Sequence, residues 1–380
     1  MARTKMKNPL KVSLRYLRSI DLVLALAVIA LSLFGLAVIK SATLSEESGR
    51  SFLVQTIGIC LGIALMIVVS LFDYELLCDL WIPLIIVSAG LNLLTAIIAE
   101  DIDGNRNWLN LGFFNLQPSE FTKMAFALSF SRHLERVGSE ISRLKNVLFL
   151  GLHFLAYFLP VVLQGDIGSA LIYLGVFCIL VYVAGIKYRY IAIAGIVGIS
   201  AVPIVWQFFS DYHRARIIYA FQPELDPLKY GYQPLLSQKA IGSGQFWGMG
   251  YAQGLQTQNN QLPADRTDFI FSVVGEEFGF IGCICVIAAL IVIIVLIFKD
   301  AFKAKSKSGC YICLTVACII ALQAVVNIGM CIGVSPVIGV TLPFMSYGGS
   351  SVLSLFIGIG LVQSVKKKPE KVLNFKIIND

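Results

Sequence analysis

The residue best placed for chemistry is Asp268, which lies where a long polar stretch gives way to an apolar run. A carboxylate can take a proton from a hydroxyl group if it is held next to a ligand. We take a helix to begin near Thr267. The positions that then share the face of Asp268 are Ser272, Gly275, Gly279 and Gly282. The pattern predicts a carboxylate at the membrane surface, above a groove that almost lacks side chains. The alternative is an acid that caps a helix, with glycines that allow close helix packing.

A pair of opposite charges, Glu120 and Lys123, opens another apolar run after Pro118, and their spacing lets them meet on one helix face. Ionisable groups inside a membrane are costly unless they face a cavity or the protein interior. The pair is therefore predicted to bind substrate, with a structural ion pair between two helices as the alternative. Asp166 is a further candidate at the mouth between two spans, or equally the N-cap of the following helix.

Arginines in two polar segments are candidates for contact with an anionic group. Arg214 and Arg216 begin a long loop, and guanidinium groups bind phosphate through planar, bidentate hydrogen bonds. The phosphate could belong to bulk lipid or to a substrate. Arg106 lies close to Trp108, and this pairing also fits a simple anchor at the lipid interface.

Ser346 lies in the segment from Gly333 to Ser351, which is rich in proline and glycine. Such a segment cannot be a plain helix, and irregular backbone at membrane depth is tolerated only where it lines a cavity or is buried in protein. The segment is predicted to form a wall of the same outward cavity as Asp268, with a simple loop as the alternative.

Apolar runs must position all of these residues, since 57% of the chain is hydrophobic and only 14% is charged. We predict an all-α integral membrane protein of ten transmembrane helices, with residues 1–380 as a single polytopic domain. The first span reads as a retained signal-anchor. The predicted spans are Leu22–Ile39, Leu53–Phe72, Leu80–Ile98, Pro118–Phe130, Val147–Leu163, Gly168–Ala184, Ile191–Phe209, Phe269–Phe298, Tyr311–Met330 and Ser351–Val365.

The basic residues predict the orientation, because short cytoplasmic loops hold an excess of lysine and arginine. They place both termini in the cytoplasm, as a segment of residues 1–21 and a tail of residues 366–380. The long loop of residues 210–267, between helices seven and eight, then faces outward together with Asp268. This topology explains the net charge of +7 and needs no nucleic acid partner.

The sequence contains no nucleotide-binding motif and no convincing metal-ligand pattern. Its nine cysteines are predicted to be small buried hydrophobes. Cys310 and Cys313 have CxxC spacing, but no second pair follows at the distance of a zinc site. The three histidines, His133, His153 and His213, are predicted to be scattered through the structure and to form no ligand cluster.

Several motifs together resemble the SEDS family of shape, elongation, division and sporulation proteins over nearly the whole chain, with the RodA branch favoured over the FtsW branch. The motifs are Gln117-Pro118-Ser119-Glu120 with Lys123, Gly165-Asp166-Ile167-Gly168, Ala240-Ile241-Gly242-Ser243-Gly244, Leu262-Pro263, Thr267-Asp268-Phe269-Ile270-Phe271, Gly275-Glu276-Glu277, and Leu342-Pro343-Phe344 with Ser346-Tyr347-Gly348-Gly349-Ser350-Ser351. The chain departs from the usual family pattern at Asn107, Gly165 and Arg266.

The resemblance implies a peptidoglycan glycosyltransferase of the bacterial cytoplasmic membrane, which polymerises lipid II at the outer face. It also implies a class B penicillin-binding protein as transpeptidase partner, alongside other proteins of cell-wall elongation or division. Asp268 is then the expected general base, and a divalent cation, Mg²⁺ or Mn²⁺, is left open. The expected substrate-binding residues are Glu120, Lys123, Arg214, Arg216, Asp166, Arg106 and Ser346.

Two other classes of function remain open from the residues alone. A flippase for a lipid-linked oligosaccharide would also place ionisable residues in broken helices around a cavity. A scaffold without catalytic activity could recruit a transpeptidase. The crowding of distinctive residues toward the outer face favours surface chemistry over transport.

Overall fold

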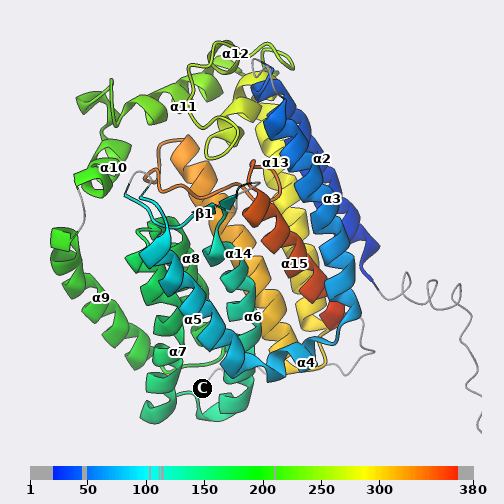
Figure 1. The fold of residues 1–380 in the computed structure, drawn as a ribbon, viewed down its shortest axis with the longest axis vertical. Helices are drawn as coiled ribbons and strands as arrows, with labels where there is room; N and C mark the ends of the chain where they lie inside the picture. The colour runs from blue at the N-terminus through cyan, green and yellow to red at the C-terminus, as the bar shows by residue number, and fades with distance from the viewer. Residues whose placement is uncertain are drawn as a thin grey trace, which may run out of the picture.

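Long apolar helices run side by side through the molecule and form a bundle (Figure 1). The computed structural model describes residues 20–44, 49–101, 104–110, 112, 115–208 and 211–366. Within them, seven helices are long and apolar enough to cross a membrane. They are α2 (Leu22–Ala42), α3 (Arg50–Leu71), α5 (Trp81–Ile98), α7 (Leu144–Leu163), α13 (Ile270–Phe302), α14 (Lys307–Cys331) and α15 (Gly349–Lys366).

Three further helices, α6 (Pro118–Val137), α8 (Ile167–Val183) and α9 (Tyr188–Phe208), coincide with the remaining predicted spans. Each predicted apolar run is therefore a helix. The prediction of an all-α membrane protein with several spans is confirmed. Within the described residues, strands occur in one short antiparallel ladder, which joins β1 (Leu109–Asn110) to β2 (Asn115–Leu116).

The long polar loop predicted at 210–267 contains short helices of its own, which lie at one end of the bundle (Figure 1). The helices are α10 (Asp211–Phe221), η2 (Pro223–Leu225), α11 (Tyr232–Ser243) and α12 (Leu255–Gln258). The opposite end of the bundle carries α4 (Tyr74–Asp79) and η1 (Gly138–Glu140). Of the predicted terminal segments, residues 1–19 and 367–380 lie outside the described residues.

The packing separates a protein-facing centre from an apolar outside. In both α14 and α15, 78% of the apolar stretch is buried, against 17% in α5. Large side chains such as Ile86, Val87 and Ile97 on α5 are exposed. A helix that is apolar all round is buried in the core, whereas an exposed apolar face suits contact with lipid tails. The bundle is therefore organised around α14 and α15.

Helix α13 is broken at Gly279, whose φ of 65° and ψ of −162° are not helical. The break frees backbone groups, and the loop after α11 satisfies them. The amide of Phe280 donates to the carbonyl of Gln245 (2.8 Å), and the amide of Met249 donates to the carbonyl of Glu276 (2.9 Å). Backbone polar groups at membrane depth need such partners. Loop and helix therefore form one interlocked unit.

This interlock overturns the predicted open strip below Asp268. A Cβ atom on Gly275 would lie 2.9 Å from Cγ1 of Ile241, and one on Gly279 would lie 2.4 Å from the amide nitrogen of Gly248. The glycines leave room for the chain's own loop instead of for an open groove. The sequence reasoning failed because it assumed an unbroken helical period through Gly279.

Candidate functional site

Asp268 lies two residues before the first turn of α13, because the helix begins at Ile270 and its N-cap is Phe269. The prediction of a helix from Thr267 was therefore early by three residues. The carboxylate does not cap the helix, since no side-chain hydrogen bond caps this end. The capping alternative for Asp268 is thus wrong, and the half-buried carboxylate has a different role.

The backbone around Asp268 is held by residues from distant parts of the chain. Asn327 of α14 donates through Nδ2 to the carbonyls of both Asp268 (2.8 Å) and Val340 (2.7 Å). Its amide therefore ties the acid-bearing segment to the irregular segment that precedes α15. Within the described residues, no hydrogen bond or ion pair reaches the carboxylate itself.

Ser346 supports the same segment from the other side. Its Oγ donates to the carbonyl of Thr267 (2.6 Å) and accepts from the amide of Leu342 (2.8 Å). The amide of Tyr347 donates to the carbonyl of Arg266 (2.7 Å). The segment from Gly333 to Ser351 lies against Asp268, and Ser346 is buried and holds backbone. That the segment forms a wall of a cavity stays a prediction.

Burial and one nearby cation set the electrostatics of the acid. Burial raises the pKa of Asp268 above the usual range of an aspartate, and the Arg216 guanidinium partly opposes this rise. Burial also raises the pKa of Asp265 to about 6. Asp265 was missed by the sequence reasoning, although it lies three residues from Asp268 in the same polar stretch.

Glu120 and Lys123 form the predicted ion pair within α6, with 2.7 Å between Oε1 and Nζ. Their side chains are only 7% and 2% exposed, so both charges are inside the protein. Oε2 of Glu120 also accepts from Oγ of Ser354 on α15 (3.3 Å). The pair therefore links two helices, as the structural alternative proposed, and its role toward a substrate stays a prediction.

Asp166 is the N-cap of α8, where Oδ1 accepts from the amide of Ser169 (3.0 Å). Its Oδ2 accepts from Nε2 of Gln117 (2.8 Å) and from Oγ of Ser119 (3.0 Å). Both oxygens thus bind the chain itself and join the start of α6 to the start of α8. This is the capping alternative, and residue type alone could not separate it from ligand binding.

The structure does not bring Arg214 and Arg106 into contact with the acid. Arg214 donates to the carbonyls of Trp206 (3.1 Å) and Gln207 (3.0 Å) near the end of α9. Arg106 lies 3.4 Å from a carboxylate oxygen of Asp101, and its side chain is half exposed. Of the three predicted arginines, only Arg216 acts electrostatically on Asp268.

Glu276 is a buried acid whose structural role sequence reasoning missed. Its Oε1 accepts from the amide of Gln256 (2.7 Å), and its Oε2 accepts from the amide (3.1 Å) and Oγ1 (2.6 Å) of Thr257. These bonds fasten α12 to α13 and so define the path of the chain toward Asp268. An acid inside an apolar run could have suggested such a partner.

Two further predictions need correction. Cys60, Cys178 and Cys285 are exposed, so they are not buried hydrophobes. His133 and His153 are not scattered, because their Nδ1 atoms lie 3.0 Å apart. In the described part of the chain, no group of three or more His, Cys, Asp or Glu side chains could hold a metal ion.

The fold and site define a membrane protein of several spans. At one end of its bundle it holds an aspartate whose carboxylate caps no helix. Residues 17–371 match the FtsW/RodA/SpoVE family, described as cell cycle proteins. The chain is 33% identical over 353 residues to the peptidoglycan glycosyltransferase MrdB of Escherichia coli K12, covering 91% of this chain and 93% of MrdB. It is 34% identical over 354 residues to the probable peptidoglycan glycosyltransferase FtsW of Trichlorobacter lovleyi, covering 91% and 92%.

Solved structures agree with these relatives. A chain of a peptidoglycan synthase complex that coordinates polymerization and crosslinking superposes with a TM-score of 0.79 and 29% identity, covering 91% of this chain and 97% of that chain. The rod shape determining protein RodA of Thermus thermophilus gives 0.69 and 26%, covering 91% and 96%.

The chain therefore belongs to the FtsW/RodA/SpoVE family, the SEDS family, and it is a peptidoglycan glycosyltransferase. The resemblance inferred from the motifs is confirmed. The predicted preference for the RodA branch is not resolved, because FtsW and MrdB relatives match about equally well.

Proposed function

We propose that this chain polymerises lipid II into glycan strands at the outer face of the bacterial cytoplasmic membrane, with Asp268 as the general base. The observation that carries this proposal is the state of the carboxylate. Its backbone carbonyl is hydrogen-bonded, yet within the described residues the carboxylate has no hydrogen bond or ion pair and caps no helix. Such an acid is available to a ligand.

The reaction requires a sugar hydroxyl to attack an anomeric carbon that carries a pyrophosphate. A base must take the hydroxyl proton, and a carboxylate with a raised pKa suits that step better than an ordinary aspartate. The leaving pyrophosphate needs cationic help, for which Arg216 is the best supported residue. A single inversion at an activated bond needs one base and no second catalytic acid.

The other residues predicted to bind substrate would have different roles in this proposal. Lys123 and Glu120 would act as a fixed charge pair beneath the substrate. Three further residues already bind other parts of the chain, namely Arg214, Arg106 and Asp166. They would contact the lipid-linked donor only through atoms that these bonds leave accessible. Ser346 would act by holding the segment of Asp268.

The proposed membrane topology adds α6, α8 and α9 to the seven long helices, which makes ten crossings in one membrane domain. Both termini then lie in the cytoplasm. Basic residues support this orientation, because the connections at the end opposite Asp268 include Arg136, Lys145, Lys303 and Lys307. A class B penicillin-binding protein is the proposed transpeptidase partner, together with other elongation or division proteins.

Purified protein in detergent with fluorescent lipid II tests the proposed role of Asp268. We expect polymer from the wild type and none from Asp268→Asn, because an amide cannot take the proton. The matched control is Asp265→Asn, which changes the neighbouring acid in the same way and should leave polymerisation in place. Polymer from Asp268→Asn, with loss in Asp265→Asn, would assign the base to Asp265 and contradict the proposal.

A further inference from the structure

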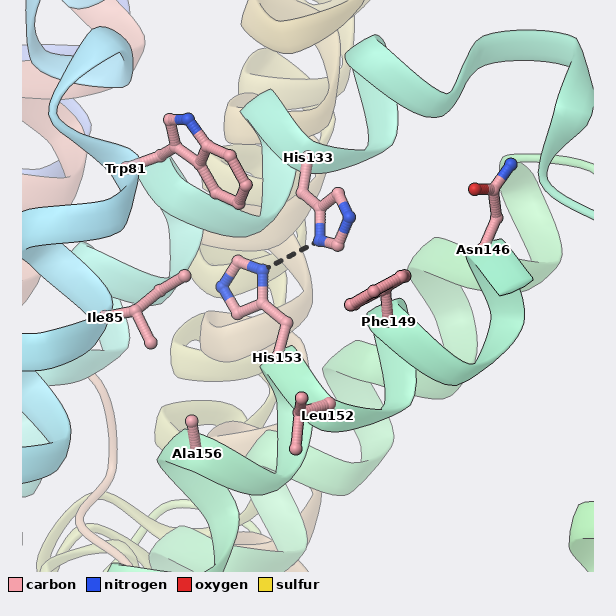
Figure 2. A pocket seen from close by; sticks show the side chains of 8 residues that line it. All are labelled: Trp81, Ile85, His133, Asn146, Phe149, Leu152, His153 and Ala156. Atoms are coloured by element: carbon pink, nitrogen blue, oxygen red, sulfur yellow. Dashed lines mark hydrogen bonds between the residues drawn. The ribbon is translucent and has the colours of Figure 1, made fainter. Parts of the chain in front are cut away.

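A cleft of about 350 Å³ lies between α5, α6 and α7 (Figure 2). It lies near the start of α5, at the end of the bundle opposite the start of α13 (Figure 1). Its lining is largely apolar and includes Ile85, Phe149, Leu152 and Ala156. Trp81 closes one side, at the first residue of α5. A volume of this size is typical of a small-ligand site, and it would take part of one acyl chain.

The cleft opens toward the lipid-facing side of the protein. Leu144, Leu148 and Leu155 surround the lining residues of α7 and are exposed at 62%, 64% and 39%. Leu152 in the lining is itself 62% exposed. An acyl chain could therefore enter from the bilayer without crossing a polar surface. Tryptophan at this position is typical of the level of lipid head groups.

Two cations stand at the rim, each over an aromatic ring of the lining. The guanidinium carbon of Arg136 lies 5.2 Å from the centre of the Trp81 ring, and Nζ of Lys145 lies 6.0 Å from that of Phe149. Among the ion pairs of the described residues, none includes Arg136 or Lys145. Their charges are therefore uncompensated at the mouth of the cleft.

Two neighbouring arginines, by contrast, are paired with acids. Arg132 is paired with Glu135 (2.8 Å), and Arg143 is paired with Glu140 (2.8 Å). Acids thus neutralise these two arginines, whereas the two cations above the lining aromatics remain for another anion. The charge pattern favours a ligand with a negative head and an apolar tail.

The inner wall of the cleft is fixed by two histidines, which Figure 2 shows pointing toward each other. Nδ1 of His133 and Nδ1 of His153 lie 3.0 Å apart, so one of them must donate a hydrogen. Nε2 of His153 also lies 3.1 Å from Oγ of Ser129. The side chains of α6 and α7 that form this wall are therefore held in place by hydrogen bonds.

We propose that this cleft binds an anionic phospholipid, with the phosphate between Arg136 and Lys145 and one acyl chain against Phe149, Leu152 and Ala156. Basic pockets between membrane helices are known to suit anionic head groups. In the proposed orientation, the lipid belongs to the cytoplasmic leaflet. The site lies at the far end of the bundle from Asp268, so the inference does not depend on the catalytic assignment.

Native mass spectrometry of the detergent-purified protein tests the site, with dioleoyl phosphatidylglycerol and dioleoyl phosphatidylcholine as probes. We expect the wild type to retain phosphatidylglycerol in preference to phosphatidylcholine. The double variant Arg136→Gln/Lys145→Gln should bind phosphatidylglycerol about 25-fold more weakly, since each basic side chain near the surface contributes roughly fivefold. Equal binding of both lipids by the wild type would overturn the proposal.

Two further variants separate this site from diffuse attraction. The control Lys303→Gln/Lys307→Gln removes the same charge at the same end of the bundle and should leave phosphatidylglycerol binding unchanged. Ala156→Leu fills the cleft without changing charge and should abolish retention of the lipid. Equal losses of phosphatidylglycerol binding in both charge variants would refute the site, and so would full binding by Arg136→Gln/Lys145→Gln. These two outcomes decide the question even if Ala156→Leu does not fold.

Discussion

The buried pair of Glu120 and Lys123 can be tested by removing its charges singly and together. The variants are Glu120→Gln, Lys123→Met and the double change Glu120→Gln/Lys123→Met. Each single change leaves one charge inside the protein, where 2.7 Å now separates the partners. In Lys123→Met, Glu120 would keep, among the described residues, only Oγ of Ser354 as a side-chain partner, at 3.3 Å.

The expected magnitude follows from this burial. Removing one partner of a buried ion pair costs about 3–5 kcal/mol, whereas replacing both by neutral groups is often close to neutral. Each single variant should therefore melt roughly 6–10 °C lower than the wild type, at about 2 °C per kcal/mol for a chain of this size. The double variant should melt higher than either single variant.

The matched control is the exposed pair Glu140 and Arg143, which has the same three-residue spacing on the chain surface. Their side chains are 50% and 70% exposed, so Glu140→Gln and Arg143→Met should each cost less than about 1 kcal/mol. Melting in detergent, followed by intrinsic fluorescence, compares the two pairs. Single variants of Glu120 and Lys123 that melt like the exposed control would refute this reasoning.

The same variants separate a structural role from a role in substrate binding. If the pair only holds α6 against α15, the double variant should recover polymerisation of lipid II together with its stability. If the charges bind substrate, the double variant should be stable and inactive. We expect the second result, because two charges inside a membrane are hard to account for by packing alone.

The other predictions concern the acid and the broken helix. Asp268 must be ionised to act as a base, so the rate should fall as pH drops through its raised pKa, and Arg216→Gln should move this fall to higher pH by removing the opposing cation. Initial rates across a pH series measure this, and an unmoved profile would contradict it. Gly279→Ala should cost on the order of 1–3 kcal/mol, because its φ of 65° is strained for alanine and its Cβ would meet Gly248. Gly90→Ala, which meets no atom within 4 Å, should leave the melting temperature unchanged or slightly raised.

Most of the helices could be predicted from sequence, because seven of those in the described residues are apolar and long enough to cross a membrane by themselves. The same reasoning predicted the Glu120–Lys123 pair, since three-residue spacing within one helix fixes the distance. Both are local properties. They need no knowledge of how one helix is rotated against another.

The remaining features depend on contacts between distant segments. His133 and His153 meet because α6 and α7 turn particular faces toward each other, and their separation of 20 residues carries no such information. Asp166 is chemically suited to both a cap and a ligand, and only the positions of Gln117 and Ser119 show that its oxygens are used within the protein. At Gly279, the helical period gave no sign that a loop enters the helix.

The support of Asp268 explains why these distant contacts matter for chemistry. The consecutive carbonyls of Arg266, Thr267 and Asp268 accept from Tyr347, Ser346 and Asn327 respectively. Three backbone positions in a row are thus fixed by other elements. Catalytic groups need this kind of support, because a base acts efficiently only when its position is set before the substrate arrives. The carboxylate is held firmly through its backbone and stays available to a ligand, so a change at Asn327 should lower activity even though its Nδ2 donates only to backbone carbonyls.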